Sequence, residues 1–299
     1  MFRKKKLKGW TVFDTIVTLI AFIVILVTLY PMLYVISCSF SNPYEVLAGR
    51  VYLLPKGFTL KAYEIVGMDM KYWKSVLVTV LYVVLACLLM LTTTVLVAYP
   101  LTRPNLKFRK ILNYYLLIPM FVSGGMIPSF IVMTKYGFFN TIWAVLLPGC
   151  SIMNIILCRT YMASVSKELI ESAMLDGCRQ FQTLIKIMLP LSKPILAVIS
   201  IYTIVGQWNS WFGASIYLTN KDFWPVQLYL RQVLEALYVT KEFLEKLPYE
   251  ERLRYEEMAN SANQIRYAMI TLTVLPIIMV YPFFQKHFAK GIMLGSLKG

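Results

Sequence analysis

Two short stretches of the sequence carry side chains that are able to do chemistry. The first, Ser166–Gly177 (SKELIESAMLDG), sets carboxylates among small and apolar residues. The second, Gln207–Trp211 (QWNSW), gathers amide and indole groups inside an otherwise apolar run. Carboxylates and amides form hydrogen bonds, and indole rings stack on flat apolar faces. Both stretches are therefore suited to non-covalent recognition.

Covalent catalysis and metal binding are not supported by the residue types present. The single histidine, His287, cannot build a multi-histidine metal site or a convincing catalytic triad. None of the 14 glycines is followed by lysine, so the sequence lacks the phosphate loop of a nucleotide-binding site. The five cysteines show no pairing pattern: Cys38, Cys87, Cys150, Cys158 and Cys178. We expect a chain that is not an enzyme and that binds no metal or cofactor of its own.

Local signals in the first stretch predict a short helix. Ser166 is a suitable N-cap, and Glu168 and Glu171 fall in the first turns, where carboxylates favour the helix dipole. Gly177 is a natural stop because glycine accepts the left-handed conformation that often ends a helix. A second helical run is predicted to pass from Phe181 to Met188. We expect Leu189-Pro190, and then Lys193-Pro194, to end that run.

Composition predicts an all-α membrane protein. Hydrophobic residues make up 58% of the 299 positions, charged residues only 15%, and the mean hydropathy is +0.63. A helix of about 20 apolar residues crosses the hydrocarbon core of a bilayer. Six stretches contain no charged residue and no histidine: 15–44, 75–102, 111–134, 136–158, 194–220 and 267–285. We therefore predict six transmembrane helices.

The distribution of basic residues predicts the orientation of these spans. The short loop at 103–110 holds Arg103, Lys107, Arg109 and Lys110 and no acid. Cytoplasmic loops are enriched in Lys and Arg, so this loop and both termini are expected to lie in the cytoplasm. The first apolar run is too long for a signal peptide, and we read it as a retained span. The net charge of +15 is thus explained by topology, and nucleic-acid binding is not expected.

One transmembrane domain, 1–299, accounts for the whole chain in this interpretation. Its parts are a basic N-terminal tail (1–10), an outer loop (37–74), a cytoplasmic loop (159–193) and an outer segment (219–266). Mixed charge and helical spacing predict short helices in the outer segment, whose role the sequence leaves open.

The cytoplasmic loop also carries a family resemblance. Glu171-Ser172-Ala173, Gly177, Ile187 and Leu189-Pro190 have the spacing E-A-A-x3-G-x9-I-x-L-P. This pattern resembles the signature of the permease subunits of binding-protein-dependent ABC importers, with Ser172 in place of the middle alanine. Three further segments resemble sequences of the carbohydrate branch of that family, in particular those of oligosaccharide permeases. They are Gly124–Pro128, Asn209–Leu218 and Gln285–Gly299.

The resemblance implies that the short helix couples transport to a separate motor. In this family it docks on a cytoplasmic ATPase, where Glu171 would make a polar contact, Ser172 and Ala173 would allow close approach, and Gly177 would supply the bend. The residues expected at the coupling site are Glu168, Glu171, Ser172, Ala173, Asp176, Gly177, Leu189 and Pro190.

The same resemblance implies the partners and the location of the protein. We expect a second homologous permease, two cytoplasmic ABC ATPase subunits that bind ATP and Mg, and an extracytoplasmic solute-binding protein. The complex would lie in the lipid bilayer of the plasma (inner) membrane of a prokaryote as a multi-pass assembly. A carbohydrate, in particular an oligosaccharide, is the expected cargo, and the sequence does not identify the saccharide.

Polar and aromatic residues inside spans point to a tentative substrate path. Gln207, Trp208, Asn209 and Trp211 could stack on a sugar ring and bind its hydroxyls. The alternative places the tryptophans in helix packing or in an aromatic belt, with Asn209 bonded to a neighbouring helix. The residues that could kink spans to line a cavity are Pro119, Gly124, Gly125, Pro128, Pro276 and Pro282.

Three other functions remain open at this point. The chain could be an importer permease for a non-sugar solute. A secondary transporter would draw on an ion gradient, but the six apolar runs contain no ionisable acid or base for proton coupling. A membrane-embedded enzyme would need a catalytic cluster within the bilayer, and the sequence shows none.

Overall fold

The computed structural model describes residues 11–236, 248, 262–280 and 282–283. The described chain is all-helical and contains no strand, as the composition predicted. It divides into two compact units, Met1–Asp69 with Val233–Leu272, and Met70–Gln232 with Thr273–Gly299. Three parts of the chain lie outside the described residues. They are the tail 1–10, most of 237–261 in the predicted outer segment, and the C-terminal segment 284–299 that includes His287.

The first unit contains one long apolar helix and two short ones. Helix α1 (Val12–Ser39) begins at a capping box between Thr11 and Asp14, in which the Thr11 amide donates to Asp14 Oδ2 at 2.8 Å. Its 28 residues span about 42 Å at 1.5 Å each. Most of its side chains are exposed within the chain, as suits a helix surrounded by lipid or by other subunits.

The segment between α1 and α4 is partly helical. Helix α1 runs to Ser39, and α4 begins at Met70, so both encroach on the predicted loop 37–74. Asn42 caps α2 (Pro43–Leu47), because its Oδ1 accepts from the Tyr44 amide at 3.0 Å. Helix α3 (Lys61–Met68) follows. Cys38, Val46 and Val51 form a small buried core under Tyr34 and Tyr267.

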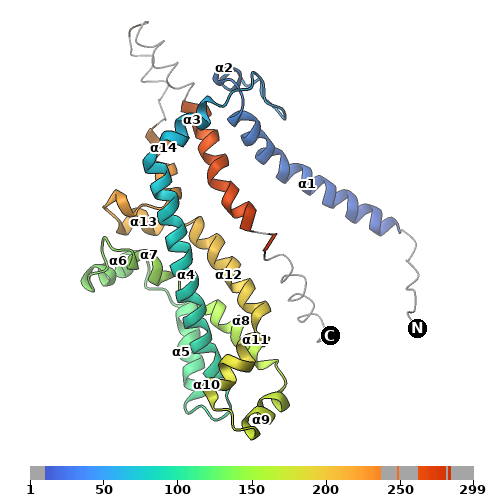
Figure 1. Ribbon diagram of the computed structural model, residues 1–299, viewed down its shortest axis with the longest axis vertical. Coiled ribbons are helices and arrows are strands. Elements are labelled where there is room, and N and C mark those ends of the chain that lie inside the picture. The colour runs from blue at the N-terminus through green and yellow to red at the C-terminus, as the bar shows by residue number, and fades with distance from the viewer. Residues whose placement is uncertain (1–10, 237–247, 249–261, 281, 284–299) are drawn as a thin grey trace. The chain divides into compact units, whose positions relative to one another are not determined.

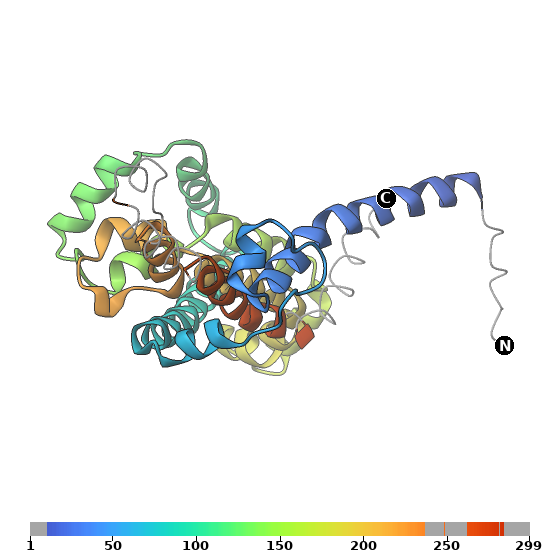
Figure 2. The ribbon, with the colours of Figure 1, turned by 90° about the horizontal axis from the view of Figure 1, so that it is seen from above.

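The second unit contains the helices and turns from α4 to α13 and most of α14 (Figure 1). They are α4 (Met70–Thr102), α5 (Arg109–Phe121), α6 (Met126–Lys135), α7 (Trp143–Leu146), η1 (Leu147–Gly149), α8 (Ile152–Ala163), α9 (Lys167–Leu175), α10 (Gln180–Thr183), η2 (Leu184–Met188), α11 (Leu189–Leu191), α12 (Lys193–Trp208), α13 (Phe212–Tyr217), η3 (Lys221–Phe223) and α14 (Val226–Ala236). Helix α4 is its central element, with α8 and α12 packed along it. Helices α6 and α13 lie side by side in both views (Figures 1 and 2), where Phe130 stacks on Tyr217.

Only three helices in the described chain are unbroken and long enough to cross a membrane. They are α1, α4 and the helix Ala262–Val280. Three further candidates are bent pairs: α5 with α6 at 117°, α7–η1 with α8 at 43°, and α10–α11 with α12 at 75°. Length and composition therefore allow between three and six crossings. The predicted runs 111–134, 136–158 and 194–220 are each interrupted in the structure, the first of them at the kink positions Gly124 and Gly125, and the count of six spans stays a prediction.

Each interruption of the predicted runs 111–134, 136–158 and 194–220 has a local cause. Helix α5 ends at Phe121, and the chain turns at Gly125, whose φ of +82° is a conformation that favours glycine. Pro148 starts the short 3₁₀ turn η1 between α7 and α8. Helix α12 ends at Trp208, where the Asn209 side chain donates to the Val205 carbonyl at 3.0 Å and competes with continued helix.

The outer segment contains helices where it is described. The turn η3 is capped by Asn220, whose Oδ1 accepts from the Asp222 amide at 2.9 Å. Helix α14 begins at Val226, which is fully buried. Its amide donates to the buried Thr79 hydroxyl of α4 at 2.7 Å, and that hydroxyl in turn donates to the Ser75 carbonyl. The prediction of short helices here is confirmed for η3 and α14.

We predict that Thr79→Val destabilises the protein by roughly 1–3 kcal/mol, because it leaves the buried Val226 amide without an acceptor. Thr93→Val is the matched control: the Thr93 hydroxyl donates to carbonyls of its own helix, lies 3.9 Å from the Cys150 thiol, and accepts from no amide of the described residues. Thermal unfolding of the detergent-solubilised protein measures both. An equal loss of stability in the two variants would contradict the role assigned to Thr79.

Candidate functional site

The predicted helix in the cytoplasmic loop is present as α9. It ends in a Schellman motif: the Cys178 amide donates to the Ala173 carbonyl at 3.0 Å, and the Gly177 amide to the Met174 carbonyl at 3.1 Å. Gly177 has a φ of +83°, which makes glycine the suitable residue at this stop. Ser166 occupies the N-cap, as predicted, but its side chain makes no capping hydrogen bond.

The predicted coupling residues divide into an exposed and a buried set. Glu168, Glu171, Ser172 and Asp176 are exposed, and none of the three carboxylates forms an ion pair or a side-chain hydrogen bond with another described residue. Ala173 is only 7% exposed. Its small side chain therefore permits close packing within this chain, and the exposed carboxylates remain available to a partner.

Large apolar side chains are also exposed around α9. Leu175 is 89% exposed, Phe181 66% and Leu169 46%. Exposed apolar side chains gathered with charged ones are typical of surfaces that bind another protein. We call this set of seven residues the α9 surface: Glu168, Leu169, Glu171, Ser172, Leu175, Asp176 and Phe181.

The helical run after Gly177 is longer than predicted. It passes through α10, a π-helical turn (η2) and α11, and breaks at Ser192. Pro190 does not end the run, because it lies in the first turn of α11 directly after the π turn, where its missing amide is tolerated. Pro194 likewise begins α12. The run breaks at Ser192, between the two predicted stops at Leu189-Pro190 and Lys193-Pro194, so the expected place of the break is confirmed and only the assignment of Pro190 as the stop was wrong.

This run is anchored to the centre of the second unit. Leu184 (5% exposed) and Met188 (fully buried) join a cluster with residues of α4, α8 and α12. Leu189 packs against the same cluster, whereas Pro190 is exposed. The Tyr99 hydroxyl of α4 donates to the Gln180 carbonyl at 2.9 Å. The segment bearing the α9 surface is thus fastened to the helices of the bundle.

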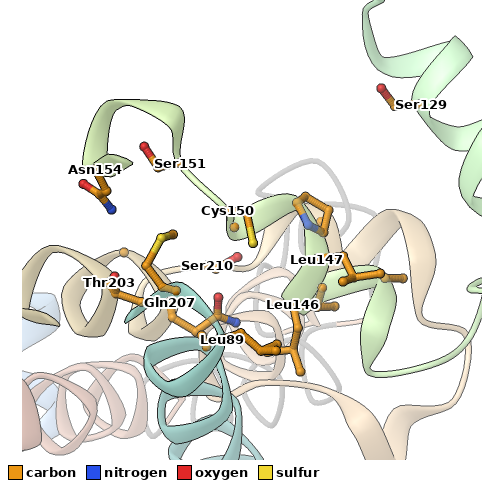
Figure 3. Close-up of a pocket in the computed structure, with 18 of the residues that line it drawn as sticks. Leu89, Ser129, Leu146, Leu147, Cys150, Ser151, Asn154, Thr203, Gln207 and Ser210 are labelled. Atoms are coloured by element: carbon orange, nitrogen blue, oxygen red, sulfur yellow. The ribbon is translucent and has the colours of Figure 1, made fainter. Parts of the chain in front are cut away.

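A cavity of about 1320 Å³ lies within the second unit. Residues from α4, α6, α7, η1, α8, α12 and α13 line it. Figure 3 shows Asn154, Ser151 and Thr203 near one part of this space, and Gln207 beside Leu89 and near Leu146. Two tyrosines, Tyr202 and Tyr217, also line the cavity. The cavity has the size and mixed lining of a small-molecule site.

Of the four residues predicted on the substrate path, Gln207 alone lines the cavity. Trp208 is buried, and its indole N–H donates to the Thr273 carbonyl at 3.1 Å. Asn209 bonds within α12 and accepts a hydrogen bond from Gln227 at 3.4 Å. Trp211 lies beneath the Arg231 guanidinium, 3.8 Å from its ring centroid. Both tryptophans are thus packed against other parts of the chain, which is the alternative to a place on the substrate path.

Several lining residues were missed by the sequence argument. Ser151 and Asn154 lie at the break before α8 and in its first turn, and Thr203 lies four residues before Gln207 on α12. Thr203 and Gln207 share a helix face at this spacing, and that periodicity was the signal available. Gly124 and Pro128, named as kink positions, both line the cavity. Of the other kink positions, Pro119 lies inside α5 and Pro276 inside the helix Ala262–Val280.

Comparison with known proteins relates the chain to membrane transport components. Residues 90–294 match the family described as "Binding-protein-dependent transport system inner membrane component". "Protein LplC" of Bacillus subtilis is 36% identical over 279 residues, covering 91% of this chain and 90% of that protein. "Polygalacturonan/rhamnogalacturonan transport system permease protein YtcP" of the same organism is 34% identical, covering 92% and 94%.

A solved structure agrees with these matches. One chain of "a bacterial ABC transporter involved in the import of the acidic polysaccharide alginate" superposes with a TM-score of 0.83 at 31% identity. The match covers 96% of this chain and 100% of that chain. The helical arrangement described above is therefore shared with a transporter over nearly the whole length of both chains.

We predict that a small water-soluble maleimide modifies Cys150 many times faster than Cys158. Cys150 is exposed and lines the cavity, whereas Cys158 is fully buried in the apolar cluster. Mass spectrometry of the cysteine peptides, with Cys150→Ser as the control, measures the two rates. Similar rates would mean that the cavity does not admit water and small solutes.

Proposed function

The chain belongs to the family of binding-protein-dependent transport system inner membrane components, and from that premise we propose that it is the permease subunit of an ATP-driven oligosaccharide importer. As a member of this family it is a multi-pass membrane transport subunit rather than an enzyme. Carbohydrate transport is the activity that its similar proteins support. Topology, coupling and partners are the further parts of the proposal.

Each bent helix pair counts as one crossing in the proposed topology. The six spans are then α1, α4, α5–α6, α7–α8, α12 with the run preceding it, and Ala262–Val280. The basic loop between α4 and α5 and the loop bearing α9 lie in the cytoplasm together with both termini, since Lys and Arg favour that side. The α9 surface then faces the compartment where ATP is available.

Exposure of the α9 surface is the observation that carries the coupling proposal. Leu169, Leu175 and Phe181 present apolar area that has no cover within the described chain, and Glu171 presents an unpaired carboxylate beside them. A cytoplasmic ATPase docked there buries the apolar area and supplies a polar contact for Glu171. When two ATPase subunits close on ATP, the docked segment moves with them.

The apolar cluster transmits this movement to the cavity. Leu184 and Met188 on the docked run pack with Met90 of α4, and Met90 also lines the cavity. Because a close-packed core deforms little, a shift of the run displaces the cavity-lining helices. The cavity is the path of the saccharide in this account, and the proposed coupling alternates its access between the two sides of the membrane.

The proposed assembly contains a second homologous permease, two ABC ATPase subunits holding ATP and Mg, and an extracytoplasmic solute-binding protein. The family description names a binding-protein-dependent system, which supports the last of these partners. The assembly lies in the inner membrane of a bacterium. Reconstitution tests the proposal: ATP hydrolysis and uptake should both require this chain and saccharide-loaded binding protein, and hydrolysis indifferent to this chain would contradict it.

Substitution of Gly177 tests the coupling step. The φ of +83° costs a β-branched side chain on the order of 2 kcal/mol, whereas asparagine tolerates it. Gly177→Val is predicted to insert normally and yet to lose most of the saccharide uptake per ATP hydrolysed, while Gly177→Asn keeps it. Space is not the cause, because a Cβ at Gly177 would meet no atom within 4 Å. Unchanged uptake in the valine variant, or equal loss in both, would contradict the assignment.

A further inference from the structure

The wall of the cavity is electrically neutral throughout. Its 26 lining residues, all in the described part of the chain, include no Asp, Glu, Lys, Arg or His. The lining side chains that carry an O–H or S–H group include the phenols of Tyr202 and Tyr217 and the thiol of Cys150. The neutral wall contrasts with the +15 net charge of the whole chain.

The polar groups on this wall are suited to hydroxyls. The side chains of Asn154, Gln207 and Ser210 form no hydrogen bond with any other described residue. A carboxamide both donates and accepts, as a sugar hydroxyl does. Thr203 donates to the Ile199 carbonyl at 2.9 Å and keeps its acceptor lone pairs. The wall can therefore exchange hydrogen bonds with an uncharged saccharide.

The apolar groups complete the match to a sugar ring. Leu89, Leu146 and Leu147 provide a surface for the C–H face of a ring, and Tyr202 and Tyr217 provide aromatic ones. A carboxylate held against the same wall would lose hydration without gaining a cationic partner, which is costly in a site of low dielectric constant. The wall is thus better suited to an uncharged saccharide than to one that carries carboxylates.

We propose that the cavity wall supplied by this chain selects uncharged saccharides over saccharides that carry carboxylates. The proposal rests on the proposed function and adds a substrate class to it. In this selectivity the chain would differ from two similar proteins that are named for acidic polysaccharides, alginate and polygalacturonan/rhamnogalacturonan. Gln207 is the residue at which the selectivity is most directly altered, since it lies on the wall and its amide has the shape of a carboxylate.

Alkylation of Cys150 in the purified complex, without the binding protein, reports what occupies the cavity. The probes are an oligogalacturonide as the free acid and the same oligomer fully methyl-esterified, which differ in charge on an identical backbone. A probe at about twice its dissociation constant slows alkylation about threefold. The methyl ester is expected to protect Cys150 to this extent, and the free acid at the same concentration is expected to leave the rate unchanged.

Two variants place the effect on this chain. In Gln207→Lys the free acid is expected to gain protection of Cys150, because the ammonium supplies the missing partner for a carboxylate. Gln207→Glu is the control of opposite charge, and in it the free acid should still fail to protect. No gain in the lysine variant would show that selectivity does not arise at this wall.

The remaining outcomes separate the inference from the proposed function. Equal protection by both probes in the unmodified complex overturns the inference and leaves the importer assignment standing. Protection by neither probe, while saccharide-loaded binding protein still stimulates ATP hydrolysis, also overturns it, because the cavity is then not the saccharide site. Absence of protection together with absence of any saccharide-stimulated hydrolysis overturns the proposed function, and the inference with it.

Discussion

The apolar cluster at the centre of the second unit is the interaction on which the rest of the structure depends. Met90 and Ala98 of α4, Cys158 and Met162 of α8, and Ile199 of α12 pack into it with Leu184 and Met188 of the run that follows α9. All of these side chains are at most 5% exposed. Burial this complete leaves no room for independent movement of the run and the bundle. The exposed α9 surface and the cavity are therefore connected through this packed cluster.

A polar contact supports this packing where the run joins the bundle. Tyr99 reaches both the carbonyl and the side-chain oxygen of Gln180, at 2.9 and 3.1 Å, and its ring lies under the Arg103 guanidinium. The π turn at 184–188 then carries the chain past Pro190 to the break at Ser192. A π turn of this kind often marks a functional site in a helix. The apolar cluster is thus the rigid part of this region, and the helical run changes direction at Ser192.

The sequence was sufficient wherever the determining signals were local. Helix α9 and its stop at Gly177 follow from capping preferences and from the conformational freedom of glycine, and both are present. Composition likewise predicted an all-helical membrane protein, and the turn at Gly125 falls at a kink position that the sequence named, whereas the charge-free run 136–158 gave no sign of the bend between α7 and α8. The environment of Trp208 could not be predicted, because its indole bonds to Thr273, a residue distant in sequence. Long-range packing decided which of Gln207, Trp208, Asn209 and Trp211 reached the cavity.

The central claim is that the α9 surface is a cytoplasmic docking site for an ATPase, and labelling of a cysteine at Leu175 tests it most directly. Leu175 is 89% exposed in this chain, so a Leu175→Cys thiol is open to a membrane-impermeant reagent. The account predicts labelling in inverted vesicles and not in intact cells, and loss of labelling when the ATPase subunits are assembled on the permease. Labelling from the outside, or labelling that the ATPase leaves unchanged, would contradict it.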